Sequence, residues 1–152
     1  MSPTTDSQAA DAIRAHHVEL HDTLRNRVAA LRTAVEAGRP FDADQRAVLD
    51  YLENELLPHA MAEEATLYKS GDTGLTAVLV RAMREEHKGL IAHVGSLRAS
   101  REGIAAASEA AAILALFESH LWKENELLIP ALVNDPAVSL SESLEGMHEL
   151  VG

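Results

Sequence analysis

Residues 113–128 read ILALFESHLWKENELL, and this stretch combines the pattern of an amphipathic helix with a histidine and a glutamate on the apolar face. Its apolar residues recur at steps of three and four, which predicts a helix with one face toward a core. The predicted inward face consists of Ile113, Leu116, Phe117, His120, Glu124, Leu127 and Leu128. A buried glutamate costs several kcal/mol unless it is paired or binds a metal, so this face predicts a partner for Glu124.

A hydrophobic period close to 3.6 continues through most of the chain, without sustained strand-like alternation. We predict helices at about 7–37, 42–70, 75–100 and 104–133, joined by short turns that contain glycine, aspartate or proline, and a helical tail at 138–151. Pro58 lies inside the second helix, where we expect a kink rather than a break. The predicted fold is all-α: a single domain, residues 1–152, that forms an up-down-up-down antiparallel four-helix bundle with a short C-terminal helical tail.

Each helix has a predicted inward stripe. The stripe residues before the fourth helix are Ile13, His17, Leu20, Leu24, Val28, Leu31 and Val35, then Val48, Leu49, Leu52, Leu56, His59, Glu63 and Leu67, then Leu79, Met83, His87, Leu90, Ile91, Val94 and Leu97. In the tail the corresponding residues are Leu140, Leu144, Met147 and Leu150.

The composition excludes several classes of function. The chain has 13 Lys and Arg against 24 Asp and Glu, a net charge of −11, which argues against nucleic acid or an anionic membrane as partner. It has no cysteine, so disulfides, thiolate nucleophiles and cysteine-ligated metals are excluded. No targeting segment is visible, and the most apolar stretch, about 105–117, is interrupted by Glu109 and followed by Glu118, too short to span a bilayer. We expect a cytoplasmic protein.

The eight histidines are the unusual feature of the composition, and four of them lie on apolar stripes, one in each helix. These are His17, His59, His87 and His120. Two are followed four residues later by glutamate, in the segments His59–Ala60–Met61–Ala62–Glu63 and His120–Leu121–Trp122–Lys123–Glu124. Residues four apart lie on one helix face, so both side chains of such a pair can bind one metal or adjacent metals.

A single histidine on an apolar face is usually a packed side chain, and an isolated H-x-x-x-E is common. Here, however, the four histidines are also expected to lie at the same depth along the bundle axis. Each neighbouring pair is equally far, within two residues, from the turn that joins its helices, at 38–40, 71–74 or 103. That mismatch is about 3 Å of helix rise, so the four imidazoles are predicted to meet in one layer of the bundle.

Six nitrogen and oxygen ligands without sulfur suit two transition metals bridged by carboxylates. A single metal with six ligands would leave no open position for chemistry. Iron is favoured by precedent for this geometry, and zinc or manganese can occupy the same ligands.

The ordered set His, His-x-x-x-Glu, His, His-x-x-x-Glu resembles the hemerythrin-like family, the HHE cation-binding domains. The matching blocks, within about residues 10–133, are His16–His17–Val18–Glu19–Leu20, Leu57–Pro58–His59 through Glu63–Glu64, Glu85–Glu86–His87, and His120 through Glu124 leading to Leu128–Ile129–Pro130. The resemblance implies a four-helix bundle with two iron ions, bridged by Glu63 and Glu124 and by an oxo or hydroxo group, with histidines completing the shells. Members of the family bind or sense oxygen, handle iron, or react with peroxide or nitric oxide.

The chain departs from the oxygen-carrying members at two positions. Ile91 stands four residues after His87, where those proteins have a second histidine, and Asn125 stands five after His120, where they have aspartate. A shell with fewer histidines argues against simple reversible oxygen carriage. His21, four residues after His17, is an additional candidate ligand.

The remaining candidates are assigned weaker roles. His16, His93 and His148 are predicted not to bind the metal, and Glu64 and Glu126 to be solvated or to lie behind the ligands. Tyr51 and Tyr68 are phenolate candidates, and Glu86 is expected to orient the neighbouring His87.

Three functions remain open. The first is a di-iron protein that binds or reacts with oxygen, peroxide or nitric oxide; the second is a catalase-like enzyme that decomposes peroxide. The third is a metal-dependent sensor, regulatory or iron-handling module whose tail, with Leu144, Met147 and His148, forms an output surface or a homodimer contact.

Overall fold

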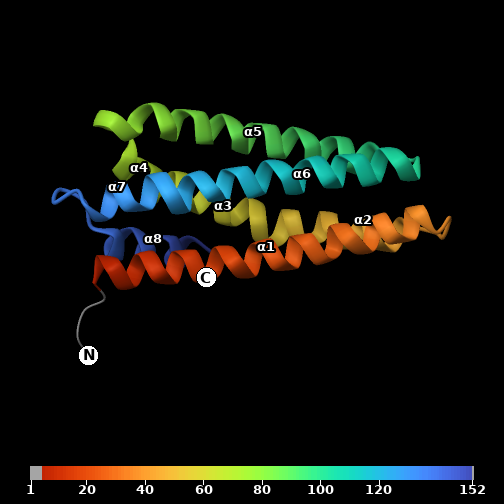
Figure 1. Cartoon of the computed structure of the whole chain (residues 1–152), viewed down its shortest axis with the longest axis horizontal. Coiled ribbons are helices and arrows are strands. Elements are labelled where there is room, and N and C mark those ends of the chain that lie inside the picture. The colour runs from red at the N-terminus through yellow and green to blue at the C-terminus, as the bar shows by residue number, and fades with distance from the viewer. Residues whose placement is uncertain (1–4, 152) are drawn as a thin grey trace.

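The structure, a computed structural model, describes residues 5–151 and contains only helices and their connections within that range. The all-α prediction is confirmed: the chain is 88% helical, with long helices packed antiparallel and an additional C-terminal helix (Figure 1). In order, the elements are α1 Asp6–Glu36, α2 Asp42–Tyr51, η1 Leu52–Leu56, α3 Leu57–Ala65, α4 Leu67–Gly71, η2 Gly74–Thr76, α5 Ala77–Ala99, α6 Gly103–Lys123, η3 Glu124–Leu128, α7 Ile129–Val133 and α8 Leu140–Val151.

The first helix is capped at its N-terminus by side chains and ends at a glycine turn. Thr5 and Gln8 form a reciprocal capping box, with the Gln8 amide donating to Thr5 Oγ1 at 3.2 Å and the Thr5 amide donating to Gln8 Oε1 at 2.9 Å. After Ala37 the chain turns through Gly38, whose φ of 65° lies in the left-handed region that glycine adopts without strain.

The second and fourth predicted helices each contain a π-helical segment of five residues. Segment η1 ends two residues before Pro58, and segment η3 ends two residues before Pro130. Proline lacks an amide hydrogen and crowds the carbonyl four residues earlier, which lies inside the π segment in both cases. The expected kink near Pro58 therefore takes the form of a π turn, and the equivalent feature near Pro130 was not predicted.

The second predicted helix also has a break that the sequence pattern did not reveal. Thr66 separates α3 from α4 with φ −126° and ψ −80°, and its hydroxyl donates to the Ala62 carbonyl at 2.7 Å. Helix α8 packs over this region, against α1, α3 and α4. Gly146 allows this close approach, because a Cβ there would lie 3.0 Å from Thr66 Cγ2.

Three residues predicted to face inward are exposed instead. Leu127 is 45% exposed because the π turn shifts the register and buries Leu128, and Ile91 is 47% exposed because Leu90 takes the inward position beside it. Leu150 is 59% exposed because Leu140 and Met147 make the buried contacts of α8.

A layer of polar residues divides the hydrophobic core into two clusters. One cluster contains Leu24, Leu52, Leu97 and Ile113, and the other contains Ile13, Tyr68, Met83 and Leu128. His17, His59 and His87 each lie between members of the two clusters along the chain, and His120 lies beside Leu121, the last residue of its helix in the first cluster. The fold therefore encloses the predicted metal layer with apolar packing on both sides.

The helical run Gly103–Val133 is the one stretch within residues 5–151 that is long and apolar enough to cross a membrane, judged by length and composition alone. The stretch at about 105–117, predicted to be too short to span a bilayer, lies inside this longer helical run. In the bundle this run packs against α5 and α1 and carries the buried His120 and Glu124.

Candidate metal centre

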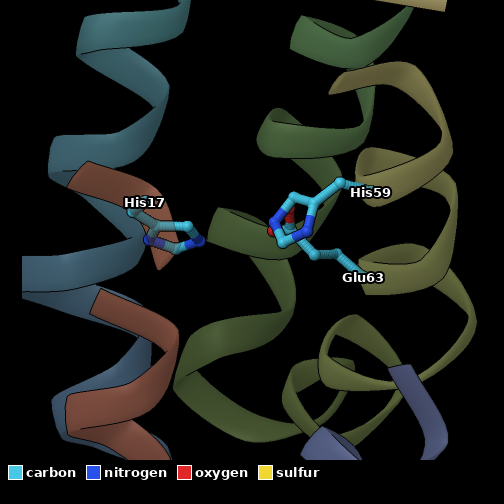
Figure 2. Close-up of side chains that lie close together, drawn as sticks. All are labelled: His17, His59 and Glu63. Atoms are coloured by element: carbon cyan, nitrogen blue, oxygen red, sulfur yellow. The ribbon is translucent and has the colours of Figure 1, made fainter. Parts of the chain in front are cut away.

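Six of the seven predicted ligands form two compact buried groups. His17, His59 and Glu63 make the first group, and within each group one ligand atom per residue lies within 4.8 Å of the others. Figure 2 shows the rings of His17 and His59 facing each other across the interior, with Glu63 beside His59. The second group consists of His87, His120 and Glu124. All six residues are at most 5% exposed.

Four helices supply these side chains, as the depth argument predicted. His17 comes from α1, His59 and Glu63 from α3, and His87 from α5. His120 lies in the last turn of α6, and Glu124 is the first residue of the π segment η3.

Glu124 links the two groups because its two carboxylate oxygens point toward different groups. Oε1 contacts His120 Nε2 and accepts a hydrogen bond from the Tyr68 hydroxyl at 2.9 Å. Oε2 lies 3.4 Å from Nε2 of His17, in the first group. A carboxylate placed in this way can bind two metals at once.

The outer nitrogen of three of the four imidazoles is held by a side chain. His17 Nδ1 lies 2.7 Å from Asn125 Oδ1, His87 Nδ1 lies 2.7 Å from Glu64 Oε1, and His120 Nδ1 lies 2.6 Å from Glu86 Oε2. Because an oxygen accepts the Nδ1 hydrogen in each case, Nε2 is the ring nitrogen that faces the interior and binds a metal once it carries no proton.

This arrangement corrects one assignment and adds two. Glu86 was expected to orient the adjacent His87, but successive helix residues point in different directions, and Glu86 reaches across to His120 on α6. His87 is held by Glu64 instead. Asn125, which the sequence singled out only because it stands where the oxygen-carrying members have aspartate, holds His17.

Tyr68 is fully buried at the second group. Its hydroxyl oxygen lies 2.8 Å from His120 Nε2 and 3.5 Å from His87 Nε2, in addition to its bond to Glu124. Tyr51, the other phenolate candidate, points elsewhere and donates to the Leu20 carbonyl at 3.3 Å.

The structure does not bring His21 into either group. Its Nε2 lies 2.8 Å from Glu118 Oε1, and its side chain is 26% exposed, because this position faces the α1–α6 surface rather than the interior. His93 similarly pairs with Glu109 at 2.7 Å, and the side chains of His16, His148 and Glu126 are exposed.

Two pockets of about 320 Å³ border the ligands. One lies between α1, η1–α3 and α8 and is lined by His59, His16, Met147 and His148, among others. The second lies between α3 and α5 and contacts His87 and Glu64. Small molecules can therefore approach the imidazoles from both sides of α3.

The residues fit a bound metal, because several of their buried polar atoms make no hydrogen bond within the described part of the chain. Within residues 5–151 no hydrogen bond is made by His17 Nε2, His59 Nε2, Glu63 Oε2 or Glu124 Oε2. A buried polar atom without a partner costs about 1–3 kcal/mol, and a cation in each group would satisfy these atoms. The donor set is nitrogen and oxygen only, which suits iron, zinc or manganese.

The histidine protonation states are compatible with metal binding. Burial lowers the pKa of His17 and of His59, and burial together with the neighbouring His120 lowers the pKa of His87, so these three imidazoles are neutral at pH 7. Burial opposes a charge on His120 as well, but hydrogen bonds to Glu124 and Glu86 outweigh it and raise the pKa of His120 to about 10.

The two buried glutamates differ in charge when no metal is bound. Burial, reinforced by the neighbouring Glu124, raises the pKa of Glu63 well above its usual value. Burial also opposes the charge on Glu124, but hydrogen bonds with Glu63 and His120 keep the pKa of Glu124 well below its usual range. The metal-free centre therefore carries protons on Glu63 and His120 that metal binding would release.

Comparison with known proteins agrees with this picture. The sequence model of one family, the hemerythrin HHE cation-binding domain, matches residues 8–132, which contain all six residues of the two groups. No curated protein and no solved structure is significantly similar to the chain.

Proposed function

Because this chain belongs to the hemerythrin HHE cation-binding domain family, we propose that it is a non-haem di-iron protein that binds or reacts with oxygen, peroxide or nitric oxide. The observation that carries the proposal is the position of Glu124, which turns one oxygen toward each of two buried His-His-Glu groups. The match of the family model over residues 8–132 confirms the predicted family resemblance, and the identity of the metal and of the small molecule is our proposal.

The proposed ligands divide between two metal positions. His17, His59 and Glu63 would hold one ion, and His87, His120 and Glu124 would hold the other. Two iron ions held in this way supply electron exchange and Lewis acidity toward a small molecule.

The protein contributes orientation, exclusion of water and proton-holding groups. Apolar clusters on both sides of the layer keep bulk water away from the ligands. Glu86 accepts from His120 Nδ1 and also contacts Lys123 Nζ, and the side chains of Glu86 and Lys123 are 14% and 30% exposed. These contacts connect the buried imidazole with the protein surface through groups that can carry protons.

Metal analysis of protein produced in iron-supplemented medium tests the proposal. We expect about two iron ions per chain and a near-ultraviolet absorption that is absent from the metal-free protein. A Glu124→Ala variant should lose both features, because it removes the shared carboxylate, whereas the exposed Glu126→Ala should retain them. Well below two metals per chain at neutral pH would refute the proposal.

Tyr68 favours peroxide decomposition as a second candidate function. Its hydroxyl lies among His87, His120 and Glu124, where a small oxygen-containing molecule that replaced Glu124 as the acceptor would receive its hydrogen bond. The expected reaction converts two hydrogen peroxide molecules into two water molecules and one oxygen molecule. Sustained oxygen evolution that is lost in Glu63→Ala would support this function, and turnover no faster than that of free iron would exclude it.

A further inference from the structure

The two histidine groups differ in the groups that hold their outer nitrogens. In the second group both outer acceptors are carboxylates, Glu64 for His87 and Glu86 for His120. In the first group the acceptor of His17 is the neutral amide of Asn125.

His59 in the first group differs further from the other three imidazoles. Within residues 5–151 no side chain is found in hydrogen-bond contact with its Nδ1. Its ring lies 4.9 Å from the exposed ring of His16, and it borders the pocket beneath α8. The first group thus has one amide and no carboxylate behind its imidazoles.

A carboxylate behind an imidazole strengthens the imidazole as a metal ligand. It draws the Nδ1 hydrogen toward itself, which increases the electron density at Nε2, and it adds a negative charge near the cation. An amide oxygen orients the ring but adds no charge. Outer partners of this kind typically change metal affinity by about 10–100-fold each.

We propose that the two metal positions are unequal: Glu64 and Glu86 anchor the metal at His87–His120–Glu124, whereas the metal at His17–His59–Glu63 exchanges readily. This inference rests on the proposed two-metal function and assigns Glu64, Glu86 and Asn125 as positioning residues. It gives the chain one retained ion and one exchangeable ion.

Release of zinc into an excess of a chromogenic chelator tests the inference without any assay of activity. Wild-type protein loaded with two zinc ions should release them in two phases of about one ion each. His17→Gln should remove the fast phase and leave the slow one, which assigns the fast phase to the first group.

The isosteric variants then test the positioning residues. Glu64→Gln and Glu86→Gln should each accelerate the slow phase by about 10–100-fold and leave the fast phase unchanged, whereas Asn125→Asp should slow the fast phase. The control is Glu85→Gln, because Glu85 is exposed, adjacent to Glu86 and paired only with Lys88 among the residues described. It should change neither phase.

The outcomes separate this inference from the proposed function. Release of two zinc ions at one rate, or acceleration of the fast phase by Glu64→Gln and Glu86→Gln, would overturn the inference and leave the two-metal proposal intact. Loading of fewer than two zinc ions before the chelator is added would overturn both.

Discussion

Removal of metal should lower the melting temperature of the loaded protein strongly, because it leaves buried polar atoms without partners. Four such atoms lie in the candidate centre: Nε2 of His17, Nε2 of His59, Oε2 of Glu63 and Oε2 of Glu124. At about 1–3 kcal/mol for each atom, their combined cost is about 4–12 kcal/mol. For a chain of this length 1 kcal/mol corresponds to about 2–4 °C, so chelation should lower the melting temperature by about 10 °C or more.

Calorimetric melts of the loaded protein with and without excess chelator measure this difference. A matched variant, Glu63→Leu, should raise the melting temperature of the metal-free protein, because an apolar side chain replaces a buried carboxyl group, and its response to chelator should shrink to that of the metal at His87–His120–Glu124. The exposed Glu126→Gln should behave as wild type. A shift below about 3 °C in protein that carried two metals beforehand would refute the reasoning.

Three further predictions concern the second group and the C-terminal helix. Tyr68→Phe should lower the unfolding free energy of the metal-free protein by about 1–3 kcal/mol without changing the metal content; loss of one metal would instead identify Tyr68 as a ligand. The raised pKa of His120 stabilises the metal-free fold fully below about pH 6.5, its unfolded value, and this stabilisation is lost as the pH rises toward 10. Chemical denaturation across that window should show the loss, and His120→Gln should flatten it; equal slopes in both proteins would contradict the assignment. Met147→Ala should lower stability by about 2–5 kcal/mol, measured by urea denaturation, if α8 is an integral part of the core, and a change below about 0.5 kcal/mol would show that α8 is only loosely attached.

The helices and the layer of polar residues inside the bundle were predictable, because both follow from the periodicity of the sequence. Steps of three and four residues define one face of a helix, and equal distances from the turns define one depth in the bundle. Both rules hold for His17, His59, His87 and His120, which the structure places in one layer. The glutamates four residues after His59 and His120 follow from the same geometry.

The π segments were less predictable, because the inward-facing residues of each helix are assigned by assuming a regular α-helical period throughout. Pro58 signalled a local change, and Pro130 carries the same signal after the pair Leu128–Ile129. One extra residue in the turn is enough to expose Leu127 and bury Leu128. A register shift of this kind depends on how neighbouring helices pack. The apolar pattern of one helix carries no information about that packing.

The particular histidine that each outer partner holds was beyond sequence reasoning for a related reason. Glu86 and Glu64 are both one residue away from a ligand, yet each holds a histidine on a different helix. Which neighbour they reach depends on helix rotation and on contacts across the bundle. The prediction for His21 depended on helix rotation in the same way. A residue four positions after a candidate ligand can also face the surface, and His21 does so and pairs with Glu118.

An anomalous difference map from crystals of the iron-loaded protein tests the central claim most directly. The account predicts two iron peaks within about 4 Å of each other, one bounded by His17, His59 and Glu63 and the other bounded by His87 and His120, with Glu124 in contact with both. A single peak, or a peak beside His21 and Glu118 instead of between the two groups, would contradict it.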